Sequence, residues 1–326
     1  MKALVTGAGG FLGRALVRAL TARGDAVRAL ARRPDLEFER PGVEVQLGDA
    51  TDPRALAEAV KGVDVVFHLA GLRRAVERDA FWRANVGSTR LLLDACVAGN
   101  PGLRRFVLAG SRAAAAPSAT GCREEEPLRP AEWYGESKAE AERVAFLYRD
   151  RLPVAVARPP RIMGPGDREN LLFFRLARAG WALEFGGPRP LSWIDVDDCA
   201  RGLLLLAERP EAVGEAFFLA SDERTTTQGL MLAAAAALGV EARRVDVPGP
   251  LLSGAAALAD LITRVTRKPL PLNRKLARQV LAPGWVCDTA KARARLGFSA
   301  TTTLAESMAR AAAWYLERGW LEPTAA

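Results

Sequence analysis

Short apolar runs alternate with segments of helical period through the first half of the chain. The runs have the length of buried strands, and they span Ala3–Thr6, Ala26–Leu30, Val43–Leu47, Val63–Leu69, Arg105–Ala109 and Val154–Ala157. The segments between them repeat apolar residues every three or four positions, and they span Leu12–Ala22, Pro53–Val60, Arg83–Ala98 and Glu132–Tyr148. This alternation predicts an α/β fold with a doubly wound parallel sheet.

The alternation weakens after about Gly164, and helical patterns dominate the rest of the chain. The clearest segments are Asn170–Ala179, Asp197–Glu208, Thr227–Leu238, Leu251–Thr266 and Leu304–Leu316. We predict a first domain over residues 1–163 and a smaller, mostly helical substrate-binding lobe over residues 164–326, with some of its segments returning to the first domain. The stretch Pro117–Pro130 is predicted to be a loop.

Composition narrows the classes of function. The net charge is +8, but the arginines are spread along the chain and rarely exceed pairs, so we expect no nucleic-acid partner. The longest apolar segments fall short of the roughly 20 residues that a membrane span needs. Met1 leads directly into an apolar strand without the pattern of an export signal. A cytoplasmic protein with no integral membrane segment is predicted.

Metal and disulfide chemistry are not expected from the sequence. The four cysteines lie far apart, and His68 is the only histidine. Metal sites and disulfide frameworks need closely spaced or clustered ligands. We therefore predict no metal site.

A glycine-rich turn follows the first predicted strand and opens the first predicted helix. It reads Thr6-Gly7-Ala8-Gly9-Gly10-Phe11-Leu12-Gly13. In this context the first glycine permits a tight turn, the second lets the backbone approach a pyrophosphate, and the third allows close packing of helix on strand. Residues 1–163 are therefore predicted to be a dinucleotide-binding domain of the Rossmann type. The cofactor contacts expected here come from Gly7, Gly9, Gly10, Phe11, Leu12 and Gly13.

The end of the second predicted strand bears on which dinucleotide is bound. No carboxylate stands there to read the ribose 2′-hydroxyl of NAD(H), and Arg32 and Arg33 occupy the position instead. Because guanidinium groups hold a 2′-phosphate with paired hydrogen bonds, NADP(H) is favoured over NAD(H). Two alternatives stay open: the arginines are merely solvated, or a bent loop presents the nearby Asp35.

Tyr134 and Lys138 form a Tyr-x-x-x-Lys pair within a predicted helix. Only 6 of the 46 basic residues are lysines, so a lysine at this position suggests a task for a compact point charge. The spacing puts phenol and ammonium on one helix face, where the cation favours the phenolate and makes the acid usable near neutral pH. The alternative is a chance pair on the helix surface.

With the glycine turn and this pair together, the chain resembles an extended short-chain dehydrogenase/reductase of the NAD-dependent epimerase/dehydratase superfamily. The resemblance covers nearly the full length. Gly48–Asp52 is similar to the acidic turn on the adenine side, His68–Gly71 to the loop after the fourth strand, and Phe106–Ser111 to the strand end that delivers a serine. Beyond the glycine turn, the cofactor contacts that the resemblance and the arginine pair imply come from Arg32, Arg33, Asp49, Ala50, Leu69, Ala70, Gly71, Asn85, Lys138 and Pro159.

The resemblance also implies a catalytic constellation of Ser111, Tyr134 and Lys138. Tyr134 exchanges a proton with the substrate oxygen, and Ser111 holds that oxygen. Lys138 hydrogen-bonds the nicotinamide ribose and favours the ionised phenol. His68, in the loop on the cofactor side, is expected to have a structural or backbone-contact role rather than that of a general base.

The predicted function is an NADP(H)-dependent oxidoreductase that reduces a ketone, or oxidises a secondary alcohol, on a hydrophobic small molecule. The apolar segments Leu171–Phe174, Trp181–Leu183 and Pro250–Ile262 favour such a substrate, and they make the chain similar to the 3β-hydroxysteroid dehydrogenase and dihydroflavonol reductase branch. Ordinary core is the alternative for each segment. The resemblance is also compatible with a homodimer.

Two other functions stay open. One is a nucleotide-sugar epimerase or dehydratase that retains NAD(P), although the alanine-rich loop Ala113–Ala116 offers few polar groups for a sugar. The other is a non-catalytic nicotinamide-nucleotide sensor, which would need none of the acid chemistry of Ser111, Tyr134 and Lys138.

Overall fold

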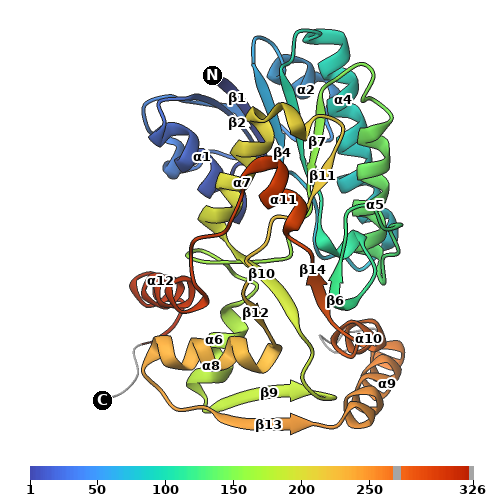
Figure 1. Ribbon diagram of the computed structural model, residues 1–326, viewed down its shortest axis with the longest axis vertical. Helices are drawn as coiled ribbons and strands as arrows, with labels where there is room; N and C mark the ends of the chain where they lie inside the picture. The colour runs from blue at the N-terminus through green and yellow to red at the C-terminus, as the bar shows by residue number, and fades with distance from the viewer. Residues whose placement is uncertain (267–272, 323–326) are drawn as a thin grey trace.

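The computed structural model describes residues 1–266 and 273–322, and its larger part is a parallel sheet between two layers of helices (Figure 1). The strands of this sheet are β1 (Lys2–Thr6), β2 (Ala26–Ala31), β3 (Val43–Leu47), β4 (Val65–His68), β5 (Arg105–Ala109), β7 (Val154–Ala157) and β11 (Ala216–Phe217). Within the described residues their order is β11-β7-β5-β4-β1-β2-β3, and every pair is parallel. The order reverses at β1, and ligands of such sheets bind beyond the carboxyl ends of the strands at that point. The predicted Rossmann-type fold is confirmed.

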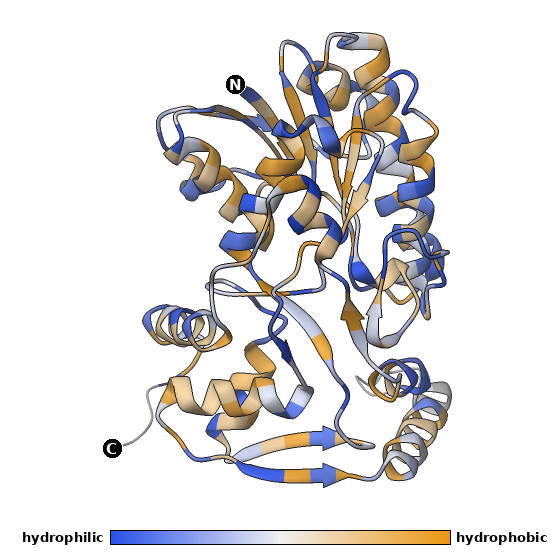
Figure 2. Cartoon of the chain, in the orientation of Figure 1, coloured by the Kyte–Doolittle hydropathy of each residue, from blue (hydrophilic) through white to orange (hydrophobic). Residues whose placement is uncertain are grey.

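Helices cover both faces of the sheet. The helices are α1 (Phe11–Ala22) and α7 (Val196–Glu208) on one face, and α2 (Pro53–Ala59), α4 (Ser88–Gly99) and α5 (Trp133–Phe146) on the other. Adjacent strand residues enter opposite cores: Val5 packs in the cluster of Leu16, and Leu4 in the cluster of Leu92. Because both faces are covered, the central strands of the sheet are mostly apolar (Figure 2), whereas the edge strand β3 carries Glu44 and Gln46 and is not fully buried at any position.

The second part of the molecule combines helices with short strands. Its helices are α6 (Leu171–Arg178), α8 (Thr227–Leu238), α9 (Gly249–Thr266), α10 (Arg274–Val280) and α12 (Leu304–Glu317). Its strands are β6 (Ser118–Cys122), β8 (Arg161–Met163), β9 (Trp181–Phe185), β10 (Leu191–Asp195), β12 (Arg224–Thr225), β13 (Arg243–Val247) and β14 (Trp285–Cys287). Helix α11 (Ala290–Leu296) packs against the large sheet, where Ala292 and Leu296 join the core beneath α1 and α7. The division of the chain at residue 163 stays a prediction.

Three local expectations needed correction. Pro117–Pro130 was expected to be a loop, but its beginning forms β6, which pairs with the distant β14. The lobe holds more strand than the helical patterns suggested, since β9, β10 and β13 have five residues each. The helix expected over Arg83–Ala98 begins with a π-helical segment, η2 (Trp82–Gly87), before α4.

No helix within residues 1–266 or 273–322 is long and apolar enough to cross a membrane. Over the same ranges, no three metal-ligating side chains come together. The cysteines are all buried free thiols.

Candidate active site

The glycine turn forms a cradle at the carboxyl end of β1. Gly7 has a φ of +69°, and a Cβ there would lie 2.6 Å from the Ala70 nitrogen. The Gly10 amide closes the turn by donating to the Gly7 carbonyl at 2.9 Å. Gly10 is also the N-cap of α1, and no side chain caps that helix. The amides at this helix end are therefore free for phosphate groups, which is the fit that a dinucleotide requires.

The remaining residues of the turn shape the start of α1. Gly9 is exposed, whereas Phe11 and Leu12 are half-buried. Gly13 is buried, and a Cβ there would stand 2.7 Å from the Ala8 carbonyl oxygen. A side chain at residue 13 would therefore push the helix away from the turn.

His68 ties the end of β4 to the glycine turn. Its Nδ1 lies 2.7 Å from the Thr6 hydroxyl, which also accepts from the Ala70 amide at 3.2 Å. Its Nε2 lies 3.3 Å from the Ser88 hydroxyl. Burial, followed by the charge of Lys138, lowers the pKa of His68 to about 3, so the ring is neutral at physiological pH. These contacts support the predicted structural role.

Replacing His68 by Gln should change how stability depends on pH. The folded pKa of about 3 lies below the unfolded value of about 6.5. The unfolded chain therefore binds more protons in this interval, and His68 makes the protein less stable as pH falls. Between pH 7 and pH 5 we expect the free energy of unfolding to fall up to about 2 kcal/mol less in His68→Gln than in the wild type. Chemical denaturation at both pH values measures this, and equal losses would contradict the assignment.

A carboxylate does reach the glycine turn, but an arginine already pairs with it. The Arg14 guanidinium donates to the Asp35 carboxylate at 2.6 Å and to the Gly9 carbonyl at 3.1 Å, and it also pairs with Glu37. Asp35 lies 3.8 Å from the position of a Cβ on Gly9. The bent-loop alternative is thus partly realised. The pairing of Arg14 with Asp35 could not be predicted from the sequence, because the two residues are 21 positions apart.

The two arginines predicted to read a 2′-phosphate lie at the end of β2. Arg32 and Arg33 are both exposed. Hydrogen bonds from Thr51 lower the pKa of the Asp49 carboxyl, and the charge of Arg32 adds to this effect. Ala50 is half-buried beside them. Arg32 and Asp49 are therefore near each other, and their contacts with the cofactor stay predictions.

Asn85 fixes the loop after β4 against α5. Its side-chain amide donates to the Ser137 hydroxyl at 2.8 Å and to the Leu72 carbonyl at 3.0 Å, and its oxygen accepts from the Leu72 amide at 2.7 Å. A Cβ on Gly71 would stand 2.8 Å from that oxygen. Asn85 lies in the π-helical segment η2, a feature often found at functional sites. Its cofactor contact stays a prediction, since its polar atoms bind the chain itself.

Ser111 and Tyr134 meet at the carboxyl end of β5. Ser111 caps the short helix η3 (Arg112–Ala114) by accepting from the Ala113 amide at 3.1 Å. Glu132 caps α5 and holds its first turn, with the Tyr134 amide at 3.1 Å. The Ser111 hydroxyl lies close enough to the Tyr134 phenol to lower its pKa. The predicted acid and the predicted oxygen-binding group are therefore adjacent.

Lys138 lies one helical turn further along α5, and it is 7% exposed. Its ammonium donates to the Ala109 carbonyl at 2.6 Å, and it would stand 3.6 Å from a Cβ on Gly71. Burial lowers its pKa to about 8. The ammonium is thus held between the end of β5 and the loop after β4.

Burial has the largest effect on the Tyr134 phenol, and the expected effect of Lys138 stays a prediction. Burial raises the pKa of Tyr134, and the Ser111 hydroxyl and the charge of Arg73 only partly offset it. The sequence pointed to Lys138 because helical spacing is visible there. The effect of Arg73 depends on how the loop after β4 folds over α5, and that signal is absent from the sequence.

Comparison with known proteins places this geometry in a family. The sequence profile of the NAD dependent epimerase/dehydratase family matches residues 3–220. The chain belongs to this family.

Relatives within the epimerase/dehydratase family span almost the whole chain. A ceramide reductase of Caulobacter vibrioides is 34% identical, over 97% of this chain and 95% of its own. A 2-alkyl-3-oxoalkanoate reductase of Stenotrophomonas maltophilia is 32% identical, over 95% of this chain and 98% of its own. The solved structure of the dTDP-glucose 4,6-dehydratase DesIV of Streptomyces venezuelae, with NAD and TYD bound, is 26% identical over 100% of both chains with a TM-score of 0.78.

These matches confirm the predicted extended short-chain dehydrogenase/reductase. They also confirm an NAD(P)-dependent enzyme that reduces a ketone or oxidises an alcohol. The roles of individual residues in this member of the epimerase/dehydratase family stay predictions.

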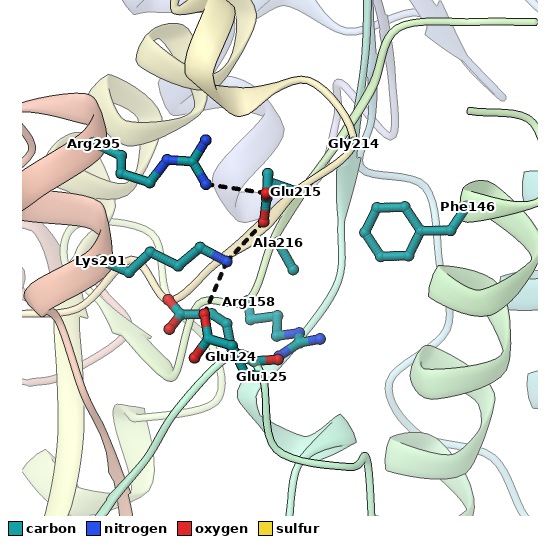
Figure 3. Close-up of a pocket in the computed structure, with 9 residues that line it drawn as sticks. All are labelled: Glu124, Glu125, Phe146, Arg158, Gly214, Glu215, Ala216, Lys291 and Arg295. Atoms are coloured by element: carbon teal, nitrogen blue, oxygen red, sulfur yellow. Dashed lines mark hydrogen bonds and ion pairs between the residues drawn. The ribbon is translucent and has the colours of Figure 1, made fainter. Parts of the chain in front are cut away.

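A charged cavity of about 400 Å³ lies at the edge of the sheet, and none of Ser111, Tyr134 and Lys138 lines it (Figure 3). Lys291 on α11 pairs there with Glu215 at 2.9 Å and with Glu125 at 3.3 Å. Arg295 pairs with Glu215 at 3.0 Å. Because these charges are satisfied by one another, we interpret the cavity as the seam that holds α11 against the sheet.

The apolar segments of the lobe divide between core and surface. Leu171 and Phe174 lie in a core cluster with Trp193, so the core alternative holds for these two. Leu172 is 58% exposed and Trp181 is 44% exposed. Helix α9 carries further exposed leucines at 251, 258 and 261. The apolar surface available to a ligand is therefore smaller than the sequence suggested.

Proposed function

We propose that the protein is an NADP(H)-dependent reductase of a ketone on a hydrophobic small molecule, with the reverse oxidation open to it. The observation that carries the proposal is the meeting of Ser111, Tyr134 and Lys138 at the carboxyl ends of β4 and β5. The phosphate cradle at Gly7 and Gly10 lies at the end of the neighbouring β1. A proton donor and a dinucleotide cradle side by side are the parts that carbonyl reduction requires.

In the proposed reaction the cofactor and the protein supply different groups to the ketone. When bound, the nicotinamide supplies the hydride. Tyr134 donates its phenolic proton to the carbonyl oxygen, and Ser111 holds that oxygen by a hydrogen bond. The raised pKa of Tyr134 keeps the phenol protonated at neutral pH, which is the state that reduction needs. Lys138 is held where it can bind the ribose next to the phenol.

A single assay tests this proposal. Purified protein is incubated with NADPH or NADH and a panel of apolar ketones, and in parallel it is tested for retained cofactor and for conversion of nucleotide sugars. We expect NADPH consumption matched one for one by alcohol. Retained NAD together with sugar isomerisation would overturn the proposal in favour of an epimerase or dehydratase.

The preference for NADP(H) is part of the proposal. Arg32 and Arg33 are exposed and available for a 2′-phosphate, while Arg14 neutralises Asp35, the carboxylate nearest the glycine turn. A carboxylate left unpaired there would repel the extra phosphate and favour a 2′-hydroxyl. Two features thus support a preference for NADP(H). Arg32 and Arg33 can attract the 2′-phosphate, and the charge of Asp35 is neutralised by Arg14.

Replacing Arg32 by Ala should weaken NADPH binding about 10-fold and leave NADH binding within about twofold, because only NADPH carries the 2′-phosphate. Quenching of intrinsic fluorescence by each cofactor measures both affinities. Arg90→Ala is the matched control, since Arg90 is an exposed arginine on α4. If Arg32→Ala leaves the ratio of the two affinities unchanged, the specificity lies elsewhere.

A further inference from the structure

Arg161 is a largely buried arginine without a carboxylate partner. It opens β8 and pairs with β10. Its guanidinium donates to the Asn170 side-chain oxygen at 2.6 Å and lies 5.2 Å from the centre of the Phe173 ring. Among residues 1–266 and 273–322, no acid lies within ion-pair distance of it, and its other N–H groups have no partner. A guanidinium offers several donors in a planar fork, so most of this one is unused.

A second arginine acts on Arg161 and on Tyr134 through its charge. Arg73 lies in the loop after β4, and within the described chain it forms no ion pair. Its charge reaches the guanidinium of Arg161, the phenol of Tyr134 and the carboxyl of Glu132. Burial, with repulsion from Arg73, lowers the pKa of Arg161 to about 10. A bound anion would offset this repulsion and favour the charged form of Arg161.

The acidic side chains nearby are engaged by other groups. Asp167 accepts from the Glu169 amide at 2.8 Å and from the Asn170 side chain. Glu169 pairs with Arg74. Glu132 accepts two backbone amides at the start of α5. Asp167 and Glu169 thus act on Arg161 through their charges, but neither forms an ion pair with it.

Arg161 lies on the side of the site that a substrate would occupy. The Arg112 amide donates to the Pro159 carbonyl at 2.9 Å, so the segment leading into β8 is tied to the residue after Ser111. The phenol of Tyr134 and the guanidinium of Arg161 both lie within reach of the charges of Arg73 and Glu169. Phe173 adds an aromatic surface beside the guanidinium.

From this arrangement we infer that the ketone substrate carries an anionic group, a carboxylate or a phosphate, that Arg161 and Arg73 hold beside Tyr134. The inference rests on the proposed reductase function and names the substrate class of the same site. Arg161 supplies a fork that matches two oxygens of either anion, and Phe173 packs against the adjoining carbon chain. The substrate is thus amphiphilic, with an apolar body and a charged end.

Steady-state kinetics with three matched probes test the inference. The probes are a medium-chain oxo acid, its methyl ester, and the phosphate monoester of a hydroxyketone of the same length. In the wild type we expect kcat/KM for one of the anionic probes to exceed that of the ester at least about 10-fold. The better of the two anionic probes identifies the anion.

Variants of Arg161 test whether this side chain binds the anionic group of the substrate. Arg161→Met should lower kcat/KM for the favoured anion about 10- to 100-fold, mainly through KM, and leave the ester within about twofold. Arg161→Lys should recover part of the loss, since it keeps the charge without the fork. Arg175→Met is the matched control, because Arg175 is an exposed arginine on α6. If Arg161→Met does not fold, Arg73→Ala provides the same comparison from an exposed loop, with a smaller loss expected.

The outcomes separate this inference from the proposed function. Equal kcat/KM for ester and both anions in the wild type, or equal losses for all probes in Arg161→Met, would overturn the anionic substrate and leave the reductase in place. Failure of every ketone to consume NADPH would overturn the reductase itself.

Discussion

Replacing Tyr134 by Phe should lower ketone turnover at least about 100-fold, while the Kd for NADPH stays within about twofold. The variant removes only the phenolic hydroxyl, which lies near Ser111. The ring keeps its place against Phe81, with centroids 6.4 Å apart. Loss of the proton donor therefore acts on the chemical step and spares the binding of the cofactor.

The other tyrosines of the chain provide the control for this experiment. Tyr148→Phe removes a phenol in the turn that follows α5, where the hydroxyl donates to Asp94 at 2.6 Å. It should retain wild-type turnover. Undiminished turnover in Tyr134→Phe, measured as NADPH oxidation under saturating cofactor, would refute the role of Tyr134 as acid.

Replacing Lys138 by Met should weaken NADPH binding and lower turnover together, with kcat/KM falling about 100-fold or more. The ammonium is fixed by the Ala109 carbonyl at 2.6 Å in a buried position. Met keeps the length of the stem but removes both the charge and the donors. Binding titrations and steady-state kinetics on the same preparation measure the two effects.

Lys138→Arg tests why a lysine stands here in an arginine-rich protein. A Cβ on Gly71 would already lie 3.6 Å from the ammonium, so the larger guanidinium has little room. We expect Lys138→Arg to recover little of the activity that Lys138→Met loses. Full activity in Lys138→Arg would show that only a positive charge is needed at this position.

The sheet domain could be predicted from the sequence because its strands and helices leave local patterns of apolar residues. Strands buried on both faces display continuous apolar runs, and amphipathic helices display their period. The glycine turn was also readable, since Gly7 must adopt a positive φ and Gly13 must admit a close backbone contact. Each of these requirements is met by a glycine at one position, so it is visible in the sequence.

The lobe and the electrostatics of the site depend on long-range contacts, which leave no such mark. Strand β6 exists because β14 pairs with it from far along the chain. Arg14 forms an ion pair with Asp35 only because the loop after β2 turns back to α1. Arg73 and Arg161 are two arginines among many in sequence, and their relation to Tyr134 follows from how β4, β8 and α5 converge.

The central claim is that the chain delivers a proton from Tyr134 while hydride passes from NADPH to a ketone. The most direct measurement uses NADPH deuterated at the transferring position of the nicotinamide ring, with mass spectrometry of the product. The account predicts one deuterium on the carbinol carbon of each alcohol formed, and loss of this product in Tyr134→Phe. Product without deuterium, or equal labelled product from Tyr134→Phe, would contradict it.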